Sequence, residues 1–404
     1  MSVTVEQPPV RDLGLEVVRL RAETPGCAHV AHFNHAGDSL SPRPVLDATI
    51  GHLEREARIG GYEAEDEAHE RLEAVYASIG RLINAAPSEI AVVENATRAW
   101  DMAVYGIPFA PGDRILTSVA EYGSNLIAFL QIAARGVSVE IVPNDEYGQL
   151  SVRALAEMLD GRVKLIAVSH MPTNGGLVQP VAEIGRLARD AGSLFVLDAC
   201  QTIGQMPIDV DAIGCDILSA TSRKYLRGPR GVGFLYVRAD LIDRLTPPFL
   251  DIHAATLVAA DRYEVRPDAR RFENWESNVA GKIGLGVAVD YALDLGLEAI
   301  WARVRAQADY LRRRLADIPG VAVHDLGAVK GGIATFTVEG VSAVTVRDAL
   351  RAQAINVSVS EITNTRLDME ARGLTELVRA SVHYLTTDEE IDQLCTAVTP
   401  LGRD

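Results

Sequence analysis

Residues 217–237 read ILSATSRKYLRGPRGVGFLYV and place Lys224 between two apolar stretches of strand length. The first stretch ends at Ala220, and the second runs from Val232 to Val237 after a turn rich in Gly and Pro. A lysine at the end of a buried strand is unusual unless it is solvated, and partial desolvation makes its amine a good nucleophile. The segment therefore predicts a reactive lysine at a sheet end, although a surface lysine in a hairpin fits the same pattern.

Short apolar stretches alternate with helical patterns before this segment. Such alternation predicts a mostly parallel α/β sheet covered on both faces. The expected strands are 90–94, 113–118, 138–142, 164–169 and 194–198, and the expected helices are 99–107, 124–134, 152–159 and 181–191.

The pattern changes after Pro247-Pro248. Residues 251–276 are polar and we expect them to be irregular. Beyond them the pattern predicts a smaller α+β domain, whose last helix starts at a capping box on Thr387. The expected helices are 279–295, 297–318 and 344–352, and the expected strands are 321–324, 332–338, 355–359 and 377–381. We therefore divide the chain into an N-terminal arm (1–30), a large domain (31–275) and a small C-terminal domain (276–404).

The composition excludes several classes of function. The 404 residues include 39 basic and 55 acidic side chains, a net charge of −16, which argues against nucleic-acid or anionic-membrane binding. No apolar run approaches the ~20 residues of a membrane span. The N-terminus lacks the apolar core of a signal peptide, so we expect a cytoplasmic protein. The four cysteines have no paired spacing, and we expect no metal site. His29, His32 and His35 recur every third residue, but without Cys or carboxylate partners we interpret them as structural.

Two further segments carry polar groups at expected strand ends. Asp198 and Gln201 lie in VLDACQ, where a strand ends and where ligands bind in open α/β sheets. Asn95-Ala96-Thr97-Arg98 lies between a strand and a helix, and the backbone N–H groups there suit a phosphate. Each segment alone also fits helix capping.

These segments, in this order, resemble the class V aminotransferase family of fold-type I pyridoxal-phosphate (PLP) enzymes, which includes the cysteine desulfurases. The resemblance runs from Phe33 to Leu394, and residues 378–392, VRASVHYLTTDEEID, are among its most specific parts. It implies the α/β fold of PLP-dependent transferases of fold type I, with a large domain around a mostly parallel sheet and a smaller C-terminal α+β domain. It also implies pyridoxal 5'-phosphate as cofactor, a small amino-acid substrate, and a homodimer with active sites at the interface.

The resemblance also implies a role for each matching position. Lys224 would hold the cofactor covalently and transfer protons, Asp198 would pair with the ring nitrogen, and Arg379 would clamp the substrate α-carboxylate. The remaining cofactor contacts are expected at Ala96, Thr97, Arg98, Tyr122, Asn174, Gln201, Thr221 and Arg223. The remaining substrate contacts are expected at His35, Arg366 and Tyr62, although a surface arginine and a packed tyrosine explain the last two as well.

Three positions depart from the family pattern. Arg223 stands where the family has a His before the lysine, and a guanidinium could bind phosphate there. Trp275-Glu276 replaces the Gly-Thr that reaches across the dimer to the phosphate, so Ser277 or Asn278 could take part instead. His35 replaces an early Asn.

The resemblance leaves several reactions open. A cysteine desulfurase needs a cysteine before the carboxylate-binding arginine, but residues 356–366 read NVSVSEITNTR. Residues 56–68 and 272–276, with the Arg223-Lys224 pair, resemble the branch that contains hercynylcysteine sulfoxide lyase. That branch implies C–S β-elimination from a cysteine S-conjugate. An aminotransferase, an epimerase and an oxidative decarboxylase-deaminase remain alternatives. A catalytically inactive PLP-fold regulator is also possible, although Lys224, Asp198 and Arg379 are all present.

Overall fold

A seven-stranded sheet forms the centre of the computed structural model, which describes residues 12–402. The strand order is β2-β8-β7-β6-β5-β3-β4, and only β8 runs antiparallel to its neighbours. The prediction of a mostly parallel α/β sheet is therefore confirmed. The strands are β2 (Ile90–Val93), β3 (Arg114–Ser118), β4 (Ser138–Val142), β5 (Val163–Ser169), β6 (Leu194–Asp198), β7 (Ile217–Thr221) and β8 (Gly233–Val237).

Alternate residues of each central strand enter two different cores, as the period of a strand requires. Ile217 belongs to one apolar cluster and Leu218 to the other. Trp100 and Phe129 complete the first core, and Ile184 belongs to the second. The covering helices are α5 (Ala96–Val104), α6 (Gly123–Ala133), α7 (Val152–Met158), α8 (Val181–Ala191) and the single turn α9 (Val210–Ile213). Burial on both faces explains why the strands read as continuous apolar runs rather than as alternating patterns.

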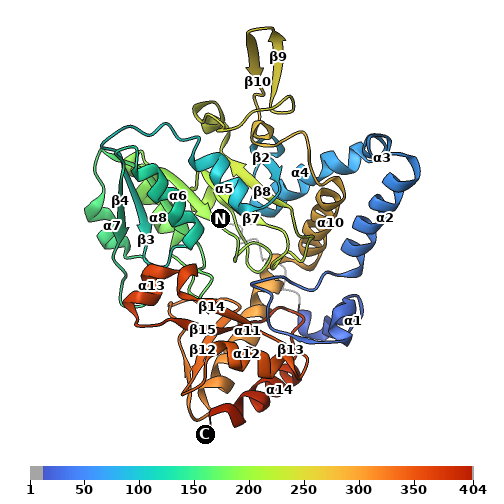
Figure 1. Cartoon of the computed structure of the whole chain (residues 1–404), viewed down its shortest axis with the longest axis vertical. Coiled ribbons are helices and arrows are strands. Elements are labelled where there is room, and N and C mark those ends of the chain that lie inside the picture. The colour runs from blue at the N-terminus through green and yellow to red at the C-terminus, as the bar shows by residue number, and fades with distance from the viewer. Residues whose placement is uncertain (1–11, 403–404) are drawn as a thin grey trace, which may run out of the picture.

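A group of long helices flanks the sheet at β2 (Figure 1). Helix α10 packs against α2 and α4. The group comprises α2 (Arg43–Ile59), α3 (Gly61–Glu67), α4 (His69–Ile83) and α10 (Val279–Leu295), and the short α1 (Val17–Ala22) precedes it. The expected boundary at 275–276 therefore separates α10 from the helices on which it packs. That boundary stays a prediction, and residues 1–11 of the expected N-terminal arm lie outside the described residues.

The C-terminal part contains a second, antiparallel sheet, which Figure 1 shows at the lower end of the molecule. Its strand order is β11-β12-β15-β14. The strands are β11 (Val321–Val323), β12 (Ile333–Val338), β14 (Ser358–Glu361) and β15 (Glu376–Ser381), and the helices are α11 (Leu297–Ala316), α12 (Ala343–Arg351), α13 (Arg366–Ala371) and α14 (Asp388–Val398). Thr387 and Glu390 form the expected capping box of α14.

Two segments differ from the sequence-based expectation. The irregular stretch expected at 251–276 contains the hairpin β9 (Ala255–Ala259) and β10 (Arg262–Val265), which projects from the body of the molecule in Figure 1. Most of its side chains are exposed, so the hairpin lacks the one-sided apolar pattern by which strands are recognised. The strand expected at 355–359 is split, because Ile355–Asn356 (β13) pairs with Ala31–His32 (β1) and β14 pairs with β15. No helix within residues 12–402 is both long and apolar enough to cross a membrane.

Candidate active site

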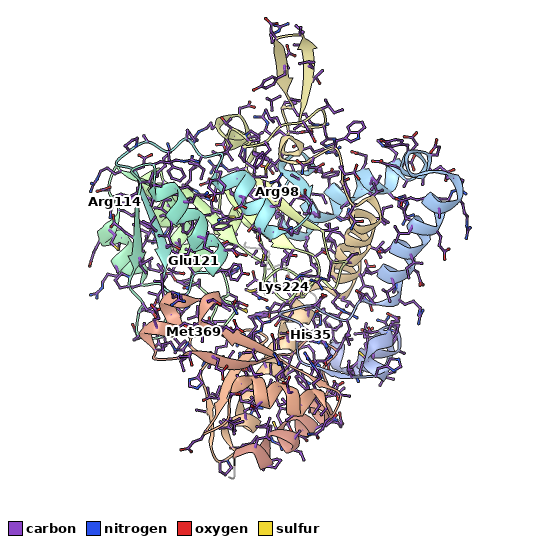
Figure 2. All side chains as sticks on the ribbon, in the orientation of Figure 1. His35, Arg98, Arg114, Glu121, Lys224 and Met369 are labelled. Carbon is purple, nitrogen blue, oxygen red and sulfur yellow. The ribbon has the colours of Figure 1, made fainter. Side chains whose placement is uncertain are left out.

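A cavity of about 430 Å³ lies at the carboxyl ends of β5, β6 and β7, and Lys224 is one of its lining residues. This is the edge of an open α/β sheet at which ligands bind. Figure 2 shows Lys224 near the centre of the molecule. The cavity is lined by Asn95, Ala96, Thr97, Tyr122, Asn125, Ser169, Met171, Thr173, Asp198, Cys200, Gln201, Thr221, Arg223 and Lys224.

The loop that carries Lys224 is fixed by backbone hydrogen bonds. Ser222 N donates to Val232 O at 3.1 Å, and Arg227 N donates to Lys224 O at 2.9 Å. Arg227 has φ 64°, and its buried guanidinium donates to Leu40 O and to the Thr24 hydroxyl. Lys224 keeps some exposed surface towards the cavity, but the surrounding protein atoms desolvate its amine and lower its pKa. The neutral, nucleophilic form of the amine is favoured in consequence.

Asp198 ends β6 and is held on both carboxylate oxygens. Cys200 N donates to its Oδ1 at 2.9 Å, and Asn125 Nδ2 donates to its Oδ2 at 3.0 Å. Gln201 Nε2 donates to Ala36 O at 3.1 Å, whereas the buried Oε1 of Gln201 has no partner among the described residues. The cavity therefore offers a fixed carboxylate and an unsatisfied amide oxygen to a ligand.

The first turn of α5 forms another wall of the cavity. The side chain of Asn95 caps this helix by accepting a hydrogen bond from Arg98 N at 2.9 Å. The backbone N–H groups at the start of a helix have no partner within the helix and favour an anion. Thr221 and Arg223 line the same cavity and add a hydroxyl and a guanidinium.

Arg379 reaches the edge of the cavity from β15 of the C-terminal sheet. Its Nη1 donates to the carbonyl oxygen of Thr173 at 3.1 Å and to the Thr173 hydroxyl at 2.5 Å. Its buried Nε has no partner among the described residues. Burial lowers the pKa of Arg379 to about 10, so the side chain remains charged at neutral pH. Arg379 is therefore a cation whose Nε–H group has no hydrogen-bond acceptor among the described residues.

These groups match the chemistry of pyridoxal phosphate. An amine of lowered pKa suits its aldehyde, a fixed carboxylate suits its pyridine nitrogen, and a helix N-terminus with a guanidinium suits its phosphate. The unpartnered Gln201 Oε1 shows a polar atom in this cavity that no protein group satisfies.

Comparison with known proteins gives the same result. Residues 31–394 match the model of the protein family described as "Aminotransferase class-V". The chain belongs to the class V aminotransferase family. It is 30% identical over 93% of its length to a probable cysteine desulfurase of Methanothermobacter thermautotrophicus, of which 95% is covered.

Solved structures of related enzymes match this fold over nearly the whole chain. The apo cysteine desulfurase of Thermococcus onnurineus has a TM-score of 0.89 and 25% identity, with 98% of this chain and 100% of that chain covered. A cystine C–S lyase in complex with its product, cysteine persulfide, has a TM-score of 0.84 and 24% identity, with coverage of 93% and 99%. The enzyme is therefore PLP-dependent and has the PLP-dependent transferase fold of type I.

Most of the predicted cofactor residues line the cavity, and their binding roles stay predictions. Asn174 does not line it, because its Nδ2 donates to Asp368 Oδ2 at 2.7 Å. Arg98 does not line it either, since its guanidinium lies 4.8 Å from the centre of the Phe249 ring. The predicted residues that do line it are Ala96, Thr97, Tyr122, Asp198, Gln201, Thr221, Arg223 and Lys224.

None of the four predicted substrate residues is among the cavity-lining residues, although Arg379 contacts the lining residue Thr173. The other three lie farther away. His35 is buried, with its Nδ1 2.9 Å from the Ser39 hydroxyl and its ring 4.8 Å from that of His383. Arg366 is half-exposed and pairs with Glu370 at 2.6 Å. Tyr62 is 71% exposed and belongs to α3. Figure 1 shows this helix at an outer corner of the molecule. Neighbouring residues of an extended segment point to opposite sides, so Asn34 rather than His35 approaches Arg379, with its Oδ1 3.4 Å from Nη2.

Six lining residues were not predicted from the sequence. They are Asn95, Asn125, Ser169, Met171, Thr173 and Cys200. Ser169 ends a predicted strand, and Cys200 lies within the segment that already suggested a site, so both carried a positional signal. Thr173 directly precedes Asn174, which the resemblance favoured instead. No group of His, Cys, Asp and Glu within residues 12–402 could hold a metal ion.

Proposed function

We propose that this enzyme cleaves the C–S bond of an S-substituted cysteine by β-elimination, as in the hercynylcysteine sulfoxide lyase-like branch. The placement of the cysteines carries this proposal. Within residues 356–366, the backbone oxygen of Thr363 lies against Gly123, the neighbour of the cavity residue Tyr122. This segment contains no cysteine that could receive sulfur.

Cys200 is the one cysteine among the cavity-lining residues. Burial and the negative charge of Asp198 raise the pKa of its thiol well above the usual value. A thiol is a poor sulfur nucleophile compared with a thiolate. Cys215 and Cys395 are buried elsewhere in the structure, and Cys27 does not line the cavity. Direct release of the sulfur group therefore accounts better for this set of residues than transfer to an enzyme cysteine.

The side chains supply the steps that elimination needs. Bound PLP supplies a ring that stores the electron pair left at the substrate α-carbon. Lys224 would hold the cofactor and would serve as the general base that removes the substrate α-proton. Arg379 would hold the substrate α-carboxylate, and Asp198 would be the partner of the cofactor ring nitrogen. The sulfur group leaves with the electrons of its bond to the β-carbon, and the remaining three-carbon unit hydrolyses to pyruvate and ammonia.

A cysteine desulfurase is the second candidate. The curated relative reported above, from Methanothermobacter thermautotrophicus, bears the name of a probable cysteine desulfurase, and not that of the expected lyase branch. Cys200 would be the sulfur acceptor, since it lies in the cavity with Lys224. Transamination, epimerisation and oxidative decarboxylation-deamination use the same core residues and are outcomes of the test below.

We further propose a homodimer. Large apolar side chains are exposed on the β9–β10 hairpin, at the residues after it and on α2. They are Leu257, Tyr263, Trp275, Ile50 and Leu53. Exposed apolar patches mark interaction surfaces when they are contiguous. A monomeric mass in solution at full cofactor occupancy would contradict this assembly.

The test is a product assay on the purified holoenzyme with cysteine, S-alkyl cysteines and an S-alkyl cysteine sulfoxide. The proposal expects pyruvate, ammonia and the sulfur product in equal amounts from the S-substituted substrates. Alanine formation from free cysteine alone, with an enzyme persulfide that releases sulfide only when a dithiol reductant is added, would favour the desulfurase. Conversion of the cofactor to its amine form, loss of optical activity, or O2 consumption would assign transamination, epimerisation or oxidation. A holoenzyme inert with all of them would favour the regulator.

A further inference from the structure

Glu121 is an acidic side chain enclosed in the protein beside the cavity. It lies in the turn between β3 and α6, is 2% exposed, and is labelled in Figure 2. No arginine, lysine or histidine within residues 12–402 forms an ion pair with it, although its carboxylate is buried. A buried carboxylate needs hydrogen-bond donors to remain charged.

Five donors surround the Glu121 carboxylate. Oε1 accepts from Tyr122 N at 2.9 Å, from Asn125 Nδ2 at 2.8 Å and from the Ser169 hydroxyl at 2.5 Å. Oε2 accepts from Ser169 N and from the Thr117 hydroxyl, both at 3.0 Å. Two of these donors are backbone N–H groups that cannot become acceptors. Asn125 Nδ2 also can only donate, so three of the five partners favour a charged carboxylate, whereas the Ser169 and Thr117 hydroxyls can either donate or accept.

The side-chain amide of Asn125 joins two carboxylates. Its Nδ2 donates to Glu121 Oε1 at 2.8 Å and to Asp198 Oδ2 at 3.0 Å. Since both neighbours are acceptors, only the amide nitrogen can stand between them, and a flipped amide would place its oxygen against a carboxylate. Glu121 thus determines which way Asn125 points, and Asn125 fixes one oxygen of Asp198.

The strand register explains why these groups meet. Ser169 at the end of β5 is the register partner of Asp198 at the end of β6, and β5 also pairs with β3, which leads to Glu121. The Ser169 main chain and side chain both bind Glu121, so the ends of three adjacent strands hold the two carboxylates in one place.

We propose that Glu121 is a positioning residue that acts through Asn125 to hold Asp198 in one orientation at the cofactor ring nitrogen. The inference rests on the proposed pairing of Asp198 with that nitrogen. Burial raises the pKa of Glu121, and the charge of Asp198 raises it further, so the two carboxylates repel each other. A protonated ring nitrogen placed next to Asp198 relieves this repulsion, and Glu121 therefore strengthens cofactor binding and favours the protonated ring.

The test is a double-mutant cycle on PLP binding to the apoprotein. Glu121→Gln keeps the shape but removes the charge and one acceptor oxygen, and Asp198→Asn does the same at the ring nitrogen. We expect Glu121→Gln to weaken PLP binding about tenfold, because a hydrogen bond to a charged group is lost. Asp198→Asn should weaken it more, and the double variant should resemble Asp198→Asn, since Glu121 acts through Asp198.

Glu140→Gln is the matched control. Glu140 also bears a carboxylate and lies in β4 of the large sheet, but it pairs with Arg114 at 2.5 Å and does not line the cavity. PLP affinity of this variant should stay within about twofold of wild type. The visible absorbance of the holoenzyme gives a second readout, because Glu121→Gln should change its pH midpoint whereas Glu140→Gln should not.

The outcomes separate the inference from the proposed role of Asp198. If Asp198→Asn binds PLP as tightly as wild type, that role is wrong. If Asp198→Asn weakens binding while Glu121→Gln behaves like Glu140→Gln, only the positioning role is overturned. Losses that multiply in the double variant would also overturn it, since they would show independent action. If Glu121→Gln does not fold, Asn125→Ala tests the same connection, because it removes the link and leaves four donors on Glu121.

Discussion

The Arg379 guanidinium donates two hydrogen bonds to Thr173, one to its carbonyl oxygen at 3.1 Å and one to its hydroxyl at 2.5 Å. Arg379 belongs to the C-terminal sheet and Thr173 to the loop after β5 of the large sheet. The contact therefore fixes a cation from one sheet at the edge of a cavity formed by the other. The buried Nε of Arg379 has no protein partner among the described residues, so the guanidinium retains a donor for a ligand carboxylate.

Replacing this guanidinium tests carboxylate recognition. Arg379→Lys keeps the charge but loses the paired N–H donors, so kcat/KM for an amino-acid substrate should fall by ~10- to 100-fold. Kinetics with an S-alkyl cysteine and with the matching S-alkyl cysteamine, which lacks the carboxylate, give the measurement. The preference for the carboxylate should shrink in the variant. Arg366→Lys is the control, since Arg366 is half-exposed and paired with Glu370, and it should change neither value beyond about twofold.

Cys200 offers a test of how sulfur leaves. If release is direct, Cys200→Ala should keep kcat/KM for S-substituted cysteines within about threefold, because the thiol only packs against the cavity. Cys395→Ala, in the last helix, serves as the control for general effects of cysteine removal. A loss of more than ~100-fold in Cys200→Ala alone, together with loss of enzyme-bound sulfur, would instead show that Cys200 accepts sulfur.

The segments buried on both sheet faces could be predicted closely from the sequence. The strand expected at 194–198 and the helix expected at 181–191 have the bounds of β6 and α8. Their apolar runs end at Gly, Pro or polar residues, which fixes the bounds. The hairpin at 255–265 was missed because its exposed side chains carry no burial pattern.

Site residues could be predicted where a single segment of sequence indicates their position. Residues whose role depends on contacts between distant segments could not be predicted. Lys224 and Asp198 each follow an apolar strand, so the sequence itself indicates a sheet edge. The roles of Glu121 and Asn125 depend on their hydrogen bonds to Ser169 and Asp198. These two partners lie on other strands, so the local sequence does not indicate the contacts. The side-chain amide of Asn174 donates to Asp368, which is distant in sequence. The sequence around Asn174 does not show that this amide already has a hydrogen-bond partner.

Gly233 lies where β8 packs closely against both the end of β7 and the first turn of α5, which forms the expected anion site. A Cβ at this position would lie 2.5 Å from Ala220 O and 3.1 Å from Ala96 N. Both neighbours are backbone atoms, so Gly233→Ala must displace β8 or the start of α5. We expect the free energy of unfolding to fall by ~1–3 kcal/mol and PLP affinity to fall with it, because the helix N–H groups move.

Gly61→Ala is the matched control, because a Cβ there meets nothing within 4 Å. Chemical denaturation and PLP titration of both apoproteins give the measurement. Weakened stability with unchanged PLP affinity in Gly233→Ala would mean that α5 keeps its place and that the displacement occurs within the sheet.

The desolvated amine of Lys224 makes the stability of the apoprotein depend on pH. Burial lowers its pKa in the folded state below the 10.5 of an exposed lysine. Below the folded-state pKa the amine is protonated in both states, and the full cost of burying the charge destabilises the fold. Between the folded-state pKa and 10.5 only the unfolded chain binds the proton, so this contribution to the free energy of unfolding rises with pH.

Lys224→Met removes this contribution while keeping an unbranched side chain in the cavity. Other titrating groups affect both apoproteins alike, so the difference between their melting temperatures isolates Lys224. The variant should melt at a higher temperature than wild type near neutral pH, and the gap should narrow as the pH is raised towards 10.5. Thermal unfolding of the two apoproteins from about pH 7 to about pH 10 measures it. A gap that stays constant or widens over this range would mean that the amine is not desolvated, which would remove the physical basis for its reactivity.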